Sequence, residues 1–173
     1  MNARVLVAGV GNIFLGDDAF GALVARALVA RPASPGVRVR DFGTRGVDLA
    51  YTLAEGFDAL VLVDSMQRGR APGTITVIEP DFRSSEPVSE LAGPAHGVDP
   101  CRVFSMLNAL GGSLRAALLV ACEPLAFGSE DEPMLEPSAP VREAILHAVP
   151  LVEALASQLV HTFATELAQV PHA

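Results

Sequence analysis

Residues 59–64 read Ala-Leu-Val-Leu-Val-Asp, a continuous apolar run that ends in a carboxylate. A run of this length with several β-branched residues is typical of a strand that is covered on both faces, as in a parallel sheet. Residues 116–121 repeat the pattern, and residues 4–8 form a shorter, mostly apolar run. These three runs predict a parallel sheet at the centre of the fold.

Segments with helical spacing of apolar residues alternate with these runs. They lie at residues 18–28, at residues 47–55, from Asp99 onward and from Ser138 onward. Asp99 and Pro100 form a start signal, because aspartate is favoured at the N-cap and proline at the first helical position. Pro150 lies inside the last segment and should kink or interrupt that helix, since an interior proline costs about 3 kcal/mol.

Residues 37–42 and 74–79 alternate apolar and polar side chains, as half-buried strands do. Strands that alternate with helices predict a mostly parallel sheet with helices on both faces. The 74–79 strand follows residues 59–63 too closely for a crossover connection, so we expect those two strands to pair in antiparallel. The predicted fold class is α/β, a three-layer α/β/α arrangement with one antiparallel strand.

The bulk composition indicates one soluble domain, residues 1–173, with a core large enough to need no disulfide. Its longest apolar segment, residues 144–168, contains charged residues and a proline, and is not the uninterrupted run of roughly 18 residues expected of a membrane span. A net charge of −8 argues against nucleic acid and anionic membranes as partners. Cys101 and Cys122 lack metal-binding spacing, so we expect reduced thiols in the cytoplasm.

Polar residues that could carry chemistry follow the predicted strands. Asp17 and Asp18 come after the first strand, Asp64 ends the 59–63 strand, and His96 lies in an irregular segment just before Asp99. Because the carboxyl ends of parallel strands meet at one edge of an open sheet, these groups should line one crevice. Two carboxylates and an imidazole there could hold a divalent transition ion with coordination positions left open.

Each of these residues also has a simpler interpretation. Asp17 suits a helix N-cap, and Asp18 a partner of the helix dipole. Asp64 could cap a turn, and His96 could be solvated. A nucleotide site is not supported, because residues 9–14 begin like a dinucleotide fingerprint but lack its third glycine.

Six short motifs follow one another along nearly the whole chain. Residues 9–21 read Gly-Val-Gly-Asn-Ile-Phe-Leu-Gly-Asp-Asp-Ala-Phe-Gly, and residues 41–49 read Asp-Phe-Gly-Thr-Arg-Gly-Val-Asp-Leu. The other four are residues 58–64, the Pro72-Gly73-Thr74 turn, residues 93–97 around His96, and Cys122-Glu123-Pro124. In this order they resemble the motifs of the nickel–iron hydrogenase maturation endopeptidases, whose second motif is DGGTxGxxL.

The resemblance implies a twisted five-stranded sheet between helices. It also implies removal of a short carboxy-terminal extension from the precursor of the hydrogenase large subunit, after nickel has been delivered. The residues that match the family's metal-contacting and catalytic positions are Asp18, Asp64 and His96. We expect Asp41, Gly43 and Thr44 to hold the substrate strand, cadmium or zinc to substitute for nickel, and the protein to be a monomer.

The chain departs from the family pattern at three positions. The first ligand is commonly glutamate, and Asp18 is one methylene shorter. Phe42 replaces a glycine of the second motif, which is expected to reshape the substrate loop. Glu123 replaces a glutamine and adds a negative charge near the same edge of the sheet.

Two mechanisms and two other functions stay open on the sequence. The precursor's nickel could dock on the three ligands as a checkpoint, or a metal held there could polarise the scissile carbonyl; the absence of an HExxH motif favours the first. A non-enzymatic nickel-sensing or chaperone-like module would bind the precursor without cutting it. A serine hydrolase using Ser65, His96 and Asp64 is disfavoured, because Ser65 lacks the glycine-flanked elbow of such nucleophiles.

Overall fold

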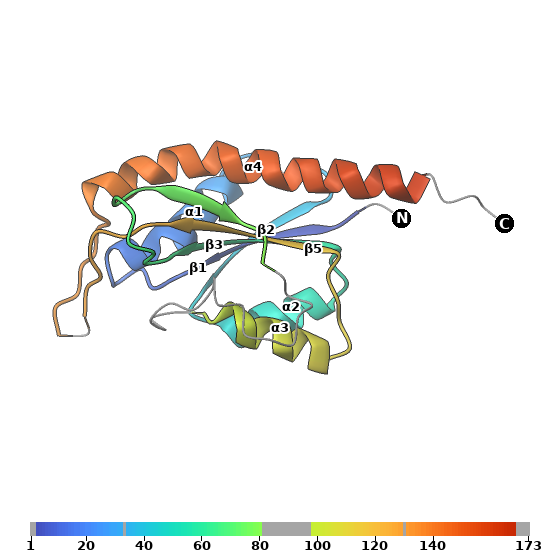
Figure 1. Ribbon diagram of the computed structural model, residues 1–173, viewed down its shortest axis with the longest axis horizontal. Helices are drawn as coiled ribbons and strands as arrows, with labels where there is room; N and C mark the ends of the chain where they lie inside the picture. The colour runs from blue at the N-terminus through green and yellow to red at the C-terminus, as the bar shows by residue number, and fades with distance from the viewer. Residues whose placement is uncertain (1–2, 33, 81–97, 130, 169–173) are drawn as a thin grey trace.

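The computed structural model describes residues 3–32, 34–80, 98–129 and 131–168. Its centre is a five-stranded sheet with the strand order β2-β1-β3-β5-β4 (Figure 1). The strands are β1 (Val5–Val10), β2 (Val37–Gly43), β3 (Ala59–Ser65), β4 (Ile75–Ile78) and β5 (Ala116–Cys122). β1 pairs in parallel with β2 and β3, β3 pairs in parallel with β5, and β4 is antiparallel to β5. The predicted mostly parallel sheet with one antiparallel strand is confirmed.

The antiparallel strand has a different neighbour from the expected one. β4 pairs with β5, and β5 lies between β4 and β3. Residues 66–74 carry the chain past the end of β5, where Met66 N donates to Cys122 O (2.9 Å) and Gly73 N donates to Glu123 O (2.8 Å). The expected orientation of β4 is right and its expected partner is wrong, because the connection crosses over β5 and does not turn back on β3.

Helices cover both faces of the sheet (Figure 1). The single-turn helix η1 (Asp17–Ala19) leads into α1 (Phe20–Val29), which shares one face with α4 (Ala139–Ala168). α2 (Gly46–Ala54) and α3 (Pro100–Ala109) cover the other face. The three-layer α/β/α arrangement follows directly from this distribution.

The two core layers explain the unbroken apolar runs of the central strands. Leu6 and Leu60 belong to the cluster under α2 and α3, whereas Val7 and Val61 belong to the cluster under α1 and α4. Every residue of β1 is buried. The edge strand β2 is mostly intermediate or exposed, which fits its alternating pattern.

Two helix signals in the sequence had different outcomes. The Asp99 side chain accepts a hydrogen bond from Cys101 N (2.9 Å) with Pro100 at the first helical position, as predicted. α4, in contrast, runs without interruption through Pro150. Pro150 and Leu146, whose carbonyl loses its usual donor to the proline, both lie on the exposed side of α4, where water can replace that bond.

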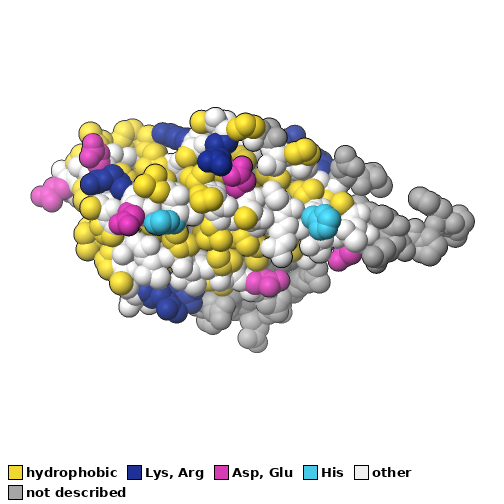
Figure 2. Space-filling view, turned by 90° about the horizontal axis from the view of Figure 1, so that it is seen from above, with side chains coloured by type: hydrophobic (Ala, Val, Ile, Leu, Met, Phe, Trp, Pro, Cys, Tyr) yellow, Lys and Arg dark blue, Asp and Glu magenta, His cyan; other side chains and the backbone are white. Residues whose placement is uncertain are grey.

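By length and composition alone, α4 could cross a membrane, a test that the core helix of a globular protein also passes. Its inner side packs against α1 and the sheet through Val141, Ala148 and Val152, all fully buried. Figure 2, which looks onto this layer, shows apolar side chains interspersed with acidic, basic and histidine side chains. The buried apolar residues of α4 therefore belong to the core.

Candidate active site

The candidate site lies where the carboxyl ends of β1 and β3 meet. After β1 the chain crosses one face of the sheet through α1 and forms β2 on one side of β1. After β2 it crosses the other face through α2 and forms β3 on the opposite side of β1. This change of direction creates a crevice between neighbouring parallel strands, the usual ligand position in open α/β sheets. Asp18 and Asp64 both lie at this crevice and are only 3% and 8% exposed.

The carboxylate of Asp18 links the loop after β1 to the end of β3. Its Oδ2 accepts a hydrogen bond from Asn12 N (2.7 Å), and its Oδ1 accepts one from Ser65 Oγ (3.3 Å). The Ser65 hydroxyl is thus committed to a carboxylate, and no described histidine hydrogen-bonds to it. The serine-hydrolase alternative also requires His96, which lies outside the described residues.

Asp64 is a buried acid next to a second acid. Burial raises the pKa of Asp64 well above its usual value, the nearby Asp18 charge raises it further, and the hydrogen bond from Ser65 N to Asp64 Oδ1 (2.8 Å) acts in the opposite direction. Two carboxylates that repel each other in a poorly solvated crevice favour either a shared proton or a bound cation.

Two glycines allow this close arrangement. A Cβ on Gly21 would lie 2.0 Å from Val63 O and 2.3 Å from Val10 O, so only glycine lets α1 start directly against the ends of β1 and β3. Gly11 has φ +129°, and a Cβ there would lie 1.8 Å from Asp18 O. Both glycines belong to the 9–21 motif, which therefore encodes the approach of Asp18 to β3.

Asp17 has a role that the sequence interpretation missed. It is fully buried, and η1 has no side-chain cap, so Asp17 is not the expected N-cap. Its Oδ2 accepts hydrogen bonds from Leu125 N (2.7 Å), Ala126 N (3.1 Å) and Ser138 Oγ (2.9 Å), and its Oδ1 accepts one from Ser138 N (2.6 Å). Asp17 thus holds Leu125, Ala126 and Ser138 beside η1, through contacts across more than 100 positions that no local pattern signals.

The predicted substrate residues lie at the carboxyl end of β2 and in the turn that follows it. Asp41 Oδ2 accepts from Arg26 Nε (2.8 Å) and Asp41 Oδ1 from Gly43 N (2.9 Å), so this carboxylate shapes the turn. Gly43 O accepts from Gly11 N (2.9 Å), which places the turn beside the loop that holds Asp18. Thr44 is exposed on the same turn and is available for contact with a substrate.

The third predicted ligand, His96, lies outside the described residues. Within the ranges that the structure does describe, no three histidine, cysteine or acidic side chains gather closely enough to hold a metal ion. The described part of the site is therefore the pair of Asp18 and Asp64.

The two remaining departures from the family pattern have structural explanations. Phe42 is fully buried in the core under α2, with the Arg40 guanidinium 4.8 Å from its ring centre, so it points into the core and away from Thr44 and the turn after β2. Glu123 is 7% exposed. Its Oε2 accepts a hydrogen bond from Arg68 N (2.8 Å), and its Oε1 accepts one from Gly69 N (3.1 Å). Its charge holds the loop after β3 in place.

The chemistry of the described pair fits a divalent cation. A cation between Asp18 and Asp64 would remove their mutual repulsion and compensate the burial that raises the pKa of Asp64. Carboxylates alone suit hard ions, so a nickel or zinc ion would need an imidazole in addition. The pair can thus contribute two oxygen ligands at the switch point of the sheet.

Comparison with known proteins gives a consistent result. The family model for hydrogenase maturation proteases matches residues 22–157. The hydrogenase 2 maturation protease of Escherichia coli is 29% identical over 160 residues, covering 85% of this chain and 96% of that protein. The hydrogenase expression/formation protein HupD of Rhizobium leguminosarum is 31% identical over 151 residues, covering 84% of this chain and 70% of that protein.

The solved structures agree with the sequence relatives. The hydrogenase maturating endopeptidase HybD from Escherichia coli superposes with a TM-score of 0.73 at 28% identity, covering 90% of this chain and 93% of that chain. The [NiFe] hydrogenase maturation protease HycI from Thermococcus kodakarensis gives a TM-score of 0.71 at 25% identity, covering 90% and 94%. With the sheet order and the acid pair already established, these matches show that the chain belongs to the hydrogenase maturation protease family.

Proposed function

We propose that this protein is an endopeptidase that removes the carboxy-terminal extension of a nickel-loaded [NiFe] hydrogenase large-subunit precursor. The observation that carries the proposal is the buried pair of Asp18 and Asp64 at the switch point of a hydrogenase maturation protease fold. His96 completes the contact set, and the partner is the precursor itself.

The nickel is part of the substrate in this proposal. The precursor presents it to the oxygens of Asp18 and Asp64 and to the imidazole of His96, which fixes the position of the scissile bond. The turn formed by Asp41 and Thr44 then holds the adjacent substrate strand. The buried, mutually repelling carboxylates support this role, because they gain most from an incoming cation.

The protein acts as a monomer in the cytoplasm under this proposal, away from membranes and nucleic acid. The net charge of −8 and the two free thiols, Cys101 and Cys122, support this assignment. Cadmium or zinc in place of nickel would probe the same ligands.

The direct test incubates the purified protein with nickel-loaded and with nickel-free precursor and follows the precursor mass. We expect shortening of the nickel-loaded form only. Cleavage of both forms would refute nickel as the checkpoint, and binding without any cleavage would show the non-enzymatic module instead.

Asp18→Glu examines the departure at the first ligand. It lengthens the side chain by roughly 1.5 Å at constant charge. Retained processing is expected if the crevice has room for the longer acid, whereas loss of processing in a folded protein would show that the Asn12 N and Ser65 Oγ contacts have adapted to aspartate.

A further inference from the structure

Ser65 is the last residue of β3 and follows Asp64 directly. Val61 and Val63 pack into the core under α1 and α4, and successive side chains of a strand point to opposite faces. The side chain of Ser65 therefore lies on the α1 side of the sheet, where η1 carries Asp18. The alternation along β3 thus places a hydroxyl on the side from which Asp18 approaches the strand.

Ser65 contacts both acids of the crevice through two different groups. Its backbone N donates to Asp64 Oδ1 (2.8 Å), and its hydroxyl donates to Asp18 Oδ1 (3.3 Å), although Asp18 lies 47 positions away in the sequence. Asn12 N donates to the other oxygen, Asp18 Oδ2 (2.7 Å), so the Asp18 carboxylate is held on both oxygens. Hydrogen bonds of this kind orient the carboxylates that ligate metal ions in proteins.

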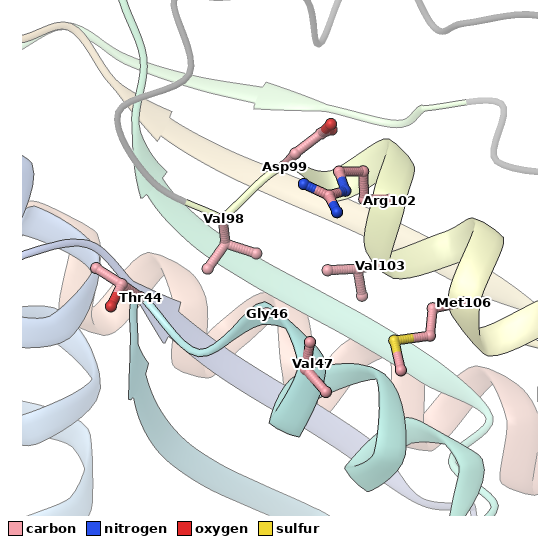
Figure 3. Close-up of a pocket in the computed structure, with 8 residues that line it drawn as sticks. All are labelled: Thr44, Gly46, Val47, Val98, Asp99, Arg102, Val103 and Met106. Carbon is pink, nitrogen blue, oxygen red and sulfur yellow. The ribbon is translucent and has the colours of Figure 1, made fainter.

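The hydroxyl of Thr44, in the turn after β2, has a different environment. Thr44 lines a cavity of about 510 Å³ between the first turns of α2 and α3 (Figure 3). None of Asp18, Asp64 and Ser65 is among the residues that line this cavity. Loss of the Ser65 hydroxyl would therefore act on the acid pair and not on the space beside Thr44.

We propose that Ser65 is a positioning residue for the acid pair. Its hydroxyl holds the Asp18 carboxylate in the orientation in which Asp18 and Asp64 contact one divalent cation together. This inference rests on the proposed function for the identity of that cation as the precursor's nickel. The role of the hydroxyl is measurable without the precursor, because cadmium alone probes the same carboxylates.

Calorimetric titration of the purified protein with cadmium tests this role. Ser65→Ala should raise the Kd for cadmium by about tenfold, which is the lower end of the effect of removing a group that orients a metal ligand. The lower end applies because Ser65 is only half-buried and its contact with Asp18 is long. Ser65→Thr keeps the hydroxyl and should bind cadmium like the wild type. Ser65→Val has a similar shape without the hydroxyl and should bind like Ser65→Ala.

Ser138→Ala is the matched control. It removes the same hydroxyl from a contact with the neighbouring acid, Asp17 Oδ2 (2.9 Å), and should leave the Kd for cadmium unchanged. The amide signal of Asn12 in the NMR spectrum gives a second readout that needs no metal. In Ser65→Ala this signal should shift, because the carboxylate that accepts from Asn12 N is no longer held on its other oxygen. In Ser138→Ala it should stay in place.

The comparison of Ser65→Thr with Ser65→Val decides the outcome. Equal Kd values for cadmium in these two variants would overturn the proposal, because they differ only in the hydroxyl. An unchanged Asn12 signal in Ser65→Ala would also overturn it, as would a wild-type protein that does not bind cadmium. If cadmium binding depends on the Ser65 hydroxyl but the wild type never shortens the nickel-loaded precursor, the protease proposal alone is refuted.

Discussion

Replacing Asp17 by alanine removes one buried carboxylate that accepts four hydrogen bonds from the segment 125–138. Three of the donors are backbone N–H groups, of Leu125, Ala126 and Ser138, and they have no other described acceptor. A donor left without a partner costs about 1–3 kcal/mol, and the lower end applies here because these donors are only partly buried. The expected loss is therefore about 3–4 kcal/mol.

Thermal unfolding followed by circular dichroism measures this loss. A change of 1 kcal/mol shifts the Tm of a domain of this size by about 2–4 °C, so Asp17→Ala should lower the Tm by about 6–16 °C. Asp99→Ala is the matched control, because that side chain accepts a single hydrogen bond at a helix N-cap. It should cost about 1 kcal/mol, or about 2–4 °C.

Hydrogen exchange localises the effect. In Asp17→Ala the amides of Leu125, Ala126 and Ser138 should lose protection, while amides of β3 keep theirs until global unfolding. A Tm for Asp17→Ala no lower than that of Asp99→Ala would refute the reasoning, since it would mean that the four hydrogen bonds add nothing to the stability of the fold.

Three further predictions follow from burial. Burial raises the pKa of the Asp64 carboxyl in the folded state, so Asp64 contributes fully to the stability of the fold below its unfolded pKa of about 3.9, and this contribution is lost as the pH rises through the folded pKa. Metal-free Asp64→Asn should therefore be more stable than the wild type at pH 7 but not near pH 4. Equal Tm values for the two proteins at pH 7 would contradict this prediction. Cys122 is buried with its pKa raised to about 12, so a thiol reagent should modify Cys101 first in the native protein, with peptide mapping as the readout. Gly21→Ala should lower the Tm by more than Gly69→Ala, because only at Gly21 would the new Cβ meet backbone oxygens.

The strand and helix pattern could be predicted well because it is local. The runs at residues 59–63 and 116–121 are apolar without alternation, and each became a strand between two helix layers. Start signals such as Asp99-Pro100 also depend on neighbouring residues alone. The closeness of Asp18 and Asp64 followed from topology, since Asp64 stands at the carboxyl end of β3 and Asp18 follows the carboxyl end of the neighbouring strand β1.

What the sequence could not reveal depends on distant partners. The strand order that places β5 between β3 and β4 depends on where residues 66–74 cross the sheet. The groups that hydrogen-bond to this connection, such as the Glu123 carboxylate, lie far along the chain. The role of Asp17 likewise depends on donors 108 to 121 positions away. A local pattern could identify an acid at the start of a helix, but not which segment would supply its hydrogen bonds.

The central claim is that Asp18 and Asp64 act together on the nickel-loaded precursor. The most direct measurement is the mass of that precursor after incubation with wild type, Asp18→Ala and Asp64→Asn, each shown to be folded by its circular dichroism. The wild type should release the carboxy-terminal extension, and both variants should leave the precursor at full length. Processing by Asp18→Ala at the wild-type rate would contradict the account, because Asp18 would then be no more than a structural partner of Asn12 and Ser65.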